Sequence, residues 1–198
     1  MDNTEQSPIA FDRGTARIER LAPVRMHFTR SKLVAERLAT NIEAAVEPGR
    51  HFMMVNRKRF DLLQFHLHST SEHLVDGERT PLEMHFVHRA EDGAILVLGL
   101  FIVEGDSLDA LEPLIEVLPV AASLPDGSTV ETSKIDIGAI LPTDRQSYRY
   151  VGSSTTPPCI ENVSWILLAD AVEMSPHQIV TIKETLQEIN DGVDNNRP

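Results

Sequence analysis

Polar and apolar residues alternate through the segment Gln64-Phe65-His66-Leu67-His68, and Glu83-Met84-His85 shows the same alternation. Successive side chains of a β-strand point to opposite faces, so His66 and His68 project together with Gln64. By the same rule, Glu83 shares a face with His85. The two segments therefore predict two strands that each present imidazoles beside a side-chain oxygen.

Three imidazoles in this setting match the ligands of a catalytic zinc site, which leaves its fourth position open to solvent. The outer ring nitrogen of a ligating histidine needs an acceptor, and Gln64 and Glu83 each supply an oxygen. A His-x-His pair alone is also typical of an exposed strand face. Because His85 lies on a second predicted strand, we predict that His66, His68 and His85 bind one metal ion.

The neighbouring polar residues allow other interpretations. His88 lies on the opposite face of its strand from His85, and His73 follows a predicted turn, so we expect structural hydrogen bonds for both. Glu72 has the spacing His-x-His-x-x-x-Glu of cupin-type metal sites, in which it would be a fourth ligand. The alternative is an outer carboxylate that accepts a hydrogen bond. A cupin would have glycine where Phe60 stands, which disfavours the first reading.

The composition is that of an ordinary globular protein. The chain has 198 residues, 41% hydrophobic and 24% charged, which fits a single domain over residues 1–198. Its formal net charge of −12 argues against a nucleic-acid partner. The apolar runs are shorter than the roughly 20 residues of a membrane span. The N-terminus has no signal-peptide pattern, and the lone Cys159 cannot form an intramolecular disulfide.

Short apolar runs broken by turns predict a mostly β fold. We expect strands over residues 59–68, 82–88, 94–103 and 163–168, with turns at Asp76-Gly77 and Asp92-Gly93. Helical spacing of apolar residues predicts a helix over 108–118, although Pro113 interrupts it. A second helix begins after Ser175, where Pro176 and Gln178 complete a capping box. The expected architecture is a single domain with a central, largely antiparallel twisted sheet and a few peripheral helices.

A run of hydroxyl residues between Gly152 and Pro158 predicts a rigid loop, because the two prolines fix their own backbone. Alone, such a run is typical of a structural turn. Together with the other motifs it resembles the α-class carbonic anhydrases, especially the bacterial branch. The motifs occur in this order: Gln6-Ser7-Pro8-Ile9, Gln64-Phe65-His66-Leu67-His68, Ser71-Glu72-His73, Glu83-Met84-His85-Phe86-Val87-His88, Gly152-Ser153-Ser154-Thr155-Thr156-Pro157-Pro158, Trp165 and Asn195-Asn196-Arg197-Pro198.

The resemblance implies a zinc lyase (carbonate dehydratase) of one-carbon metabolism, which reversibly hydrates carbon dioxide to bicarbonate and a proton by attack of a zinc-bound hydroxide. It assigns zinc to His66, His68 and His85, and the catalytic hydroxide-orienting pair to Thr155 and Glu72. Gln64, Glu83 and the backbone carbonyl of Asn195 would orient the three ligands, and His73 would form a buried structural pair with Tyr150. The implied substrate pocket comprises Val87, Val97, Val163, Trp165, Ser154 and Thr156. The resemblance also implies that sulfonamides and small anions would inhibit the enzyme.

Two departures from the family pattern predict slower turnover. Ser154 replaces a leucine at the mouth of the apolar pocket, so we expect weaker placement of carbon dioxide and a higher rate in a leucine variant. At the position of the family's proton-shuttling histidine this chain has Thr40, whose side chain does not titrate near neutrality. We expect proton export to depend on buffer.

The ends of the chain also depart from the family. The aromatic N-terminal segment, the cysteine that pairs with Cys159 in many bacterial members, and the C-terminal tail after Pro198 are missing. These differences favour the interpretation that the chain is a fragment of a longer protein that is exported, periplasmic or secreted. The alternative is a cytoplasmic variant. A catalytically silent carbonic-anhydrase-like binding domain is a second functional reading. A cupin-like metal oxygenase, with iron or manganese, is a third.

Overall fold

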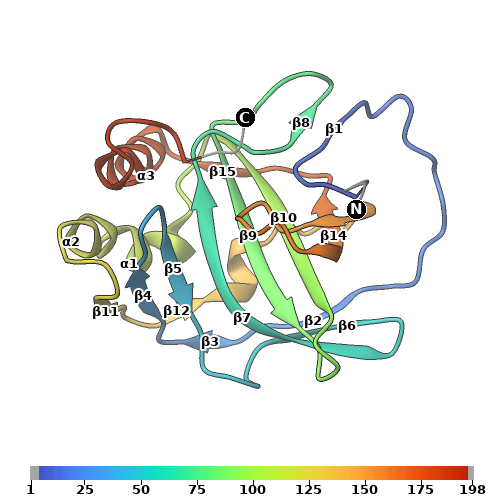
Figure 1. Cartoon of the computed structure of the whole chain (residues 1–198), viewed down its shortest axis with the longest axis horizontal. Helices are drawn as coiled ribbons and strands as arrows, with labels where there is room; N and C mark the ends of the chain where they lie inside the picture. The colour runs from blue at the N-terminus through green and yellow to red at the C-terminus, as the bar shows by residue number, and fades with distance from the viewer. Residues whose placement is uncertain (1–4, 196–198) are drawn as a thin grey trace.

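The computed structural model describes residues 5–195, which form a large twisted sheet with helices on one side (Figure 1). The main path through the sheet has the strand order β11-β4-β5-β7-β9-β10-β14-β13. In that order the bounds are Thr129–Glu131, Val34–Arg37, Ile42–Ala45, Lys58–His68, Leu82–Arg89, Ile95–Glu104, Glu161–Leu168 and Ser147–Ser153. The expected mostly β class is confirmed.

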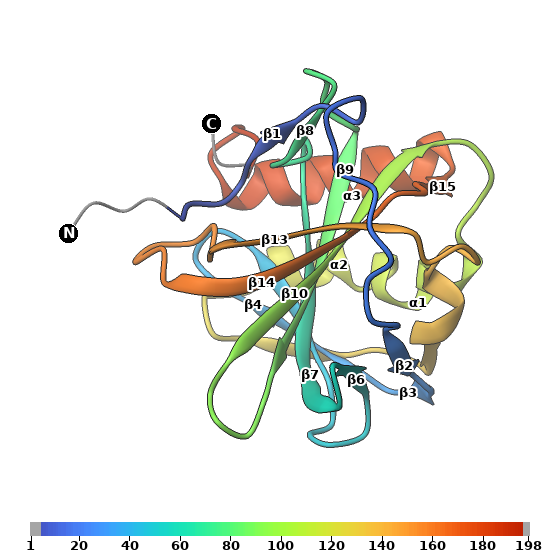
Figure 2. The same cartoon turned by 90° about the vertical axis from the view of Figure 1, so that its right-hand side faces the viewer.

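Shorter strands extend the sheet or pair beside it. Strand β2 (Arg25–His27) pairs with β6 (Phe52–Val55), β6 also pairs with β7, and β15 (Val172–Met174) pairs with β10. Two small pairs lie apart: β1 (Ala10–Phe11) with β8 (Leu74–Val75), and β3 (Arg30–Ser31) with β12 (Ile135–Asp136). Figure 2 shows β1 and β8 together at one end of the molecule.

The four predicted strands correspond to β7, β9, β10 and β14, with bounds within two residues of those expected. Strands β7, β9 and β10 pair antiparallel, as the turn at Asp92-Gly93 predicts. The pairings of β10 with β14 and with β15 are parallel, which the expectation of a largely antiparallel sheet did not specify. Parallel neighbours need a long crossover. The chain between β10 and β14 supplies it and carries most of the helices.

The helix expected over 108–118 is not continuous. A 3₁₀ turn covers Asp109–Leu111, α1 covers Glu112–Ile115 and α2 covers Leu118–Ala122. Pro113 and Pro119 each lie in a first helical turn, because proline has no N–H to donate and clashes with the preceding turn. A second 3₁₀ turn spans Ile137–Ile140.

Helix α3 (Pro176–Ile189) has the predicted capping box at its start. The Ser175 hydroxyl accepts from the Gln178 backbone N–H, and the Gln178 side chain accepts from the Ser175 N–H. Ile179, Ile182 and Leu186 are buried on one side of the helix. Within residues 5–195 no helix has both the length and the apolar character needed to cross a bilayer.

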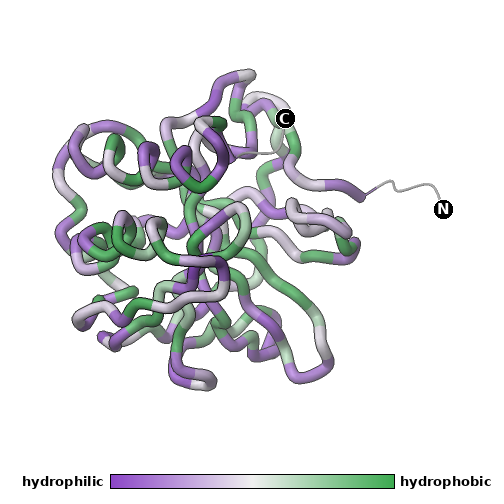
Figure 3. The backbone as a smooth tube through the Cα atoms, turned by 60° about the vertical axis from the view of Figure 1, so that its left-hand side comes forward, coloured by the Kyte–Doolittle hydropathy of each residue, from purple (hydrophilic) through white to green (hydrophobic). Residues whose placement is uncertain are grey.

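Apolar side chains pack on both faces of the sheet. Figure 3, in which the backbone is coloured by hydropathy, shows hydrophobic and hydrophilic residues following one another along much of the chain. The larger cluster fills the space between sheet and helices. The smaller one lies on the histidine face and consists of Val97, Phe101, Val163, Trp165 and Leu167. Gly99, opposite His85, has no room for a side chain, since a Cβ there would lie 2.4 Å from Leu167 Cδ2.

Candidate metal centre

Strands β7 and β9 bring three histidines together. In their antiparallel register His66 lies directly opposite His85, and His68 lies opposite Glu83. The ring centroids are 5.0 Å apart for His66 and His68, 5.4 Å for His66 and His85, and 4.7 Å for His68 and His85. One ring nitrogen from each lies within 4.8 Å of the others. This spacing suits three ligands of one tetrahedral ion.

The opposite ring nitrogen of each histidine donates to an oxygen. Nδ1 of His66 lies 2.9 Å from Gln64 Oε1, and Nδ1 of His68 lies 2.9 Å from the backbone carbonyl of Asn195. Nε2 of His85 lies 2.8 Å from Glu83 Oε1. These bonds fix the tautomer of each ring. The nitrogens left with a lone pair for a metal are Nε2 of His66, Nε2 of His68 and Nδ1 of His85.

One buried ring nitrogen, Nε2 of His68, supports the binding of a cation at this site. His68 is only 5% exposed, and among the described residues its Nε2 has no hydrogen-bond partner. A buried polar atom without a partner is costly, and a metal ion would satisfy it. The three histidines therefore fit a zinc ion in donor type, number and tautomer.

Burial sets the charge of the first two ligands. The pKa of His66 is held well below its usual value by burial and by the neighbouring imidazoles of His68 and His85, and burial likewise lowers the pKa of His68. Both are therefore neutral, the form that binds metal. For His85 burial opposes the charged form, but the Glu83 carboxylate outweighs it and raises the pKa.

The buried carboxylate of Glu72 lies close to the converging nitrogens. Its Oε2 lies 3.5 Å from His68 Nε2 and 3.8 Å from His85 Nδ1. Its backbone is held on two sides: the Glu72 N–H donates to Glu83 Oε2 at 2.9 Å, and Arg79 Nη1 donates to the Glu72 carbonyl at 3.2 Å. Arg79 also donates to the Ser71 carbonyl. Sequence reasoning did not single out Arg79, because its contact depends on the loop conformation.

A buried hydrogen-bond chain supports the site from below. Glu83 Oε1 also accepts from His73 Nδ1 at 2.7 Å, and His73 Nε2 lies 2.7 Å from the Tyr150 hydroxyl. That hydroxyl lies 2.8 Å from Ser7 Oγ. Burial opposes ionisation of Glu83, but the imidazoles of His73 and His85 hold its pKa well below the usual range. The structural role expected for His73 agrees with this arrangement, and His88 similarly bonds the Phe86 carbonyl at 2.8 Å.

The hydroxyl-rich loop follows β13 and carries Thr155, which is half-buried, and Thr156, which is exposed. The Ser154 hydroxyl accepts from the Ile160 N–H at 2.9 Å and donates to the Thr156 carbonyl at 3.1 Å. The Ser154 N–H donates to the Ile160 carbonyl at 2.9 Å. The serine side chain therefore closes this loop, a role that sequence reasoning missed.

The four apolar residues predicted for the pocket gather beside the histidines. Val97, Val163 and Trp165 belong to the smaller core cluster, and the half-buried Val87 packs against it. The Trp165 and His85 rings have centroids 4.9 Å apart. Thr40, by contrast, lies exposed in the turn between β4 and β5, where its carbonyl accepts from Asn190 Nδ2 at 3.0 Å.

Comparison with known proteins identifies the class. The family model described as eukaryotic-type carbonic anhydrase matches residues 1–198, so the chain belongs to this α-carbonic anhydrase family. The chain is 37% identical to the carbonic anhydrase of Nostoc sp. over 145 residues, which are 72% of this chain and 53% of that protein. It is 37% identical to the enzyme of Pectobacterium carotovorum over 157 residues, 79% of this chain and 61% of that protein. The chain thus spans less than two thirds of these relatives.

Solved structures of similar fold include the α-carbonic anhydrase from Thermovibrio ammonificans in complex with the inhibitor sulfanilamide. It superposes with a TM-score of 0.85 at 37% identity, covering 98% of this chain and 82% of that chain. A dioscorin complexed with ascorbate gives a TM-score of 0.88 at 26% identity, covering 98% and 81%. Family membership disfavours the cupin alternative.

Proposed function

We propose that this protein catalyses the reversible hydration of carbon dioxide to bicarbonate and a proton, with a zinc ion held by His66, His68 and His85. The observation that carries the proposal is the convergence of three ring nitrogens within 4.8 Å, each on an imidazole whose other nitrogen is bonded to an oxygen. When bound, zinc lowers the pKa of a coordinated water and so supplies a nucleophile at neutral pH, a chemistry for which carbonic anhydrases are the standard example.

The chain's own residues would keep the ligands in place. Gln64, Glu83 and the Asn195 carbonyl orient the three rings, since each accepts the proton of the nitrogen that faces away from the ion. Three neutral ligands leave the positive charge of the ion uncompensated, which favours an anionic form of the coordinated solvent. The buried Glu83–His73–Tyr150 chain adds rigidity beneath them.

Thr155 and Glu72 are proposed to orient the attacking oxygen. The Thr155 hydroxyl would donate a hydrogen bond to the Glu72 carboxylate. Its oxygen could then only accept a hydrogen bond from the nucleophile. This arrangement points a lone pair of the nucleophile toward the substrate before reaction. The bonds from Arg79 and to Glu83 fix the backbone of Glu72 and support this role.

Carbon dioxide is apolar and needs an apolar surface for placement. Val87, Val97, Val163 and Trp165 would form that wall, with Ser154 and Thr156 at its edge. We propose that serine in place of a larger apolar residue weakens this placement. Because Thr40 cannot carry a proton near neutrality, the protein would also release its proton mainly to buffer.

The proposed function also implies a class of inhibitors and a cellular location. The Thermovibrio enzyme was solved with the inhibitor sulfanilamide, and we propose that sulfonamides and small anions bind this protein at His66, His68 and His85. The relation of Cys159 to paired cysteines in bacterial members supports a periplasmic or secreted location.

Stopped-flow hydration of carbon dioxide, on protein of measured zinc content and with or without a sulfonamide, tests the function. We expect activity proportional to bound zinc, abolished by the sulfonamide and lost in His68→Asn. The matched control is His177→Asn, because His177 is exposed on α3. Zinc-loaded protein without hydration activity would contradict the proposal and favour the silent binding domain.

A further inference from the structure

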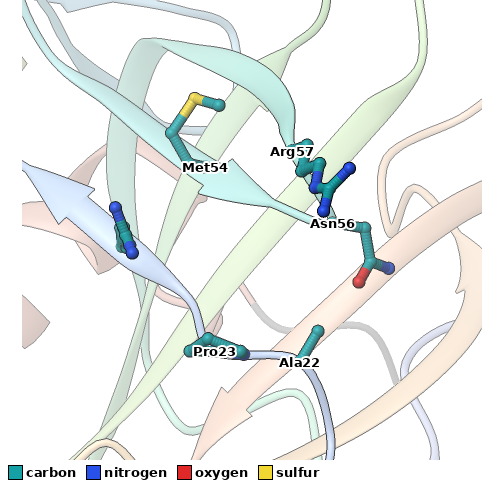
Figure 4. Close-up of a pocket in the computed structure, with 6 residues that line it drawn as sticks. Ala22, Pro23, Met54, Asn56 and Arg57 are labelled. Atoms are coloured by element: carbon teal, nitrogen blue, oxygen red, sulfur yellow. The ribbon is translucent and has the colours of Figure 1, made fainter.

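A hollow on the surface is formed by parts of the chain that the proposed function does not use. It has a volume of about 630 Å³ and is lined by Ala22, Pro23, Arg25, Met54, Asn56 and Arg57. Figure 4 shows Met54 and the Asn56–Arg57 turn on one side of it, and Ala22 and Pro23 on the other. Its size falls within the ~300–1,000 Å³ of small-molecule sites.

Two guanidinium groups line the hollow without partners. Within residues 5–195, Arg25 and Arg57 make no ion pair and no side-chain hydrogen bond. The next cations on the same hairpin are neutralised: Lys58 pairs with Asp92 at 2.6 Å, and Arg59 pairs with Asp61 at 2.7 Å. In a chain of net charge −12, two uncompensated arginines facing one hollow favour an anionic ligand.

The backbone at Arg57 is an unusual place for an arginine. Asn56 and Arg57 form the two-residue turn between β6 and β7 with φ of 50° and 65°. In such turns the second position favours glycine, since a side chain in the left-handed region costs about 1–2 kcal/mol. Locally unfavourable residues of this kind are characteristic of functional sites.

The remaining lining sets the ligand class. Met54, Pro23 and Ala22 present apolar surface, and none of the described residues that line the hollow carries a carboxylate. The segment that carries Ala22 is anchored, because Arg149 Nη1 donates to the Ala22 carbonyl at 2.9 Å. A ligand that satisfies both kinds of surface has an anionic head and an apolar body.

We propose that this hollow binds small organic carboxylates, with the carboxylate on Arg25 and Arg57 and the apolar body against Met54 and Pro23. Guanidinium groups match the planar carboxylate with paired hydrogen bonds. The site is distinct from the histidine centre in residues and strands. It does not depend on the proposed hydration activity.

The test uses ¹³C-methyl methionine NMR, with the Met54 signal assigned through Met54→Leu. Hexanoate should shift the Met54 methyl signal saturably and leave that of the fully buried Met174 unchanged. Bicarbonate, which has no apolar body, should bind at least tenfold more weakly at this site. His66→Asn should retain the hexanoate response, which separates this hollow from anion binding at the metal centre.

Arg57→Gly is the decisive variant, because glycine relieves the left-handed backbone while removing the guanidinium. Hexanoate affinity should fall at least tenfold while the melting temperature stays the same or rises. Arg59→Gln is the matched control and should bind as the unmodified chain does. An unshifted Met54 signal, undiminished binding by Arg57→Gly, or equal binding of bicarbonate and hexanoate would overturn the proposal.

Discussion

Glu83 Oε1 lies 2.8 Å from Nε2 of His85, and both side chains are buried. The same carboxylate accepts three more hydrogen bonds, one from the His73 ring and two from the Glu72 and His73 backbone N–H groups. All four partners are donors, so both oxygens must act as acceptors. Glu83 therefore fixes His85 with Nδ1 free for a metal.

Glu83→Gln should weaken zinc binding by about 10–100-fold. Either orientation of the glutamine amide turns an NH₂ group toward donors, which leaves buried groups unsatisfied and lowers the free energy of unfolding by about 1–3 kcal/mol. Zinc affinity by competition with a chelator and unfolding in urea measure both effects. Glu78→Gln, at an exposed position, is the control. Unchanged zinc affinity would show that Glu83 does not orient His85.

Replacement of Ser154 by alanine and by leucine separates loop closure from substrate placement. Both variants lose the bonds to Ile160 N–H and the Thr156 carbonyl. Only leucine adds apolar surface, about three carbon groups at roughly 0.8 kcal/mol each when fully buried. We expect kcat/KM for hydration to be about tenfold higher in the leucine variant than in the alanine variant. Equal kcat/KM values for the two variants would show that the side chain at position 154 does not line the substrate pocket.

Buffer should limit the rate of turnover. Thr40 lies exposed between β4 and β5 and offers no group that titrates near neutrality. Imidazole added at constant pH and ionic strength should therefore raise kcat severalfold in stopped-flow hydration. The same concentration of imidazole should leave kcat/KM unchanged. A kcat that does not respond to imidazole would indicate an internal proton acceptor.

Stability should decline in mild acid because of His88. Burial lowers the pKa of His88 to about 4, while the unfolded side chain titrates near 6.5. Between those pH values the unfolded state binds a proton that the folded state does not. The contribution is full above about pH 6.5 and falls by about 3 kcal/mol as the pH drops to about 4.

His88→Asn should remove this part of the pH dependence, because an amide can still donate to the Phe86 carbonyl but does not titrate. The measurement is the free energy of unfolding in urea for metal-free protein between pH 7 and 4.5. His177→Asn should keep the slope of the unmodified chain, because that side chain is exposed. Parallel slopes for the His88 variant and the unmodified chain would contradict the assignment.

Features of the structure that depend on local backbone geometry can be predicted from the sequence. The period-two alternation at residues 64–68 and 83–85 predicts both the strands and the converging imidazoles, because register and face follow from backbone geometry. The capping box at Ser175 predicts the start of α3 for the same local reason. The helix predicted over 108–118 is interrupted, because Pro113 and Pro119 each lie in the first turn of a separate short helix.

Contacts between distant segments are not visible in local patterns. The parallel pairing of β10 with β14 depends on the crossover, and the Asn195 carbonyl reaches His68 across 127 residues of chain. The family resemblance indicated that carbonyl, but no spacing in the chain does. The hollow beside Arg25 and Arg57 likewise arises only where β2 meets the β6–β7 turn.

A crystal structure with anomalous diffraction data at the zinc absorption edge would decide whether the three histidines hold the metal ion. We expect one zinc ion bound by His66 Nε2, His68 Nε2 and His85 Nδ1, with a solvent molecule as the fourth ligand. Coordination of the ion by Glu72, or a zinc ion bound away from the three rings, would contradict this expectation.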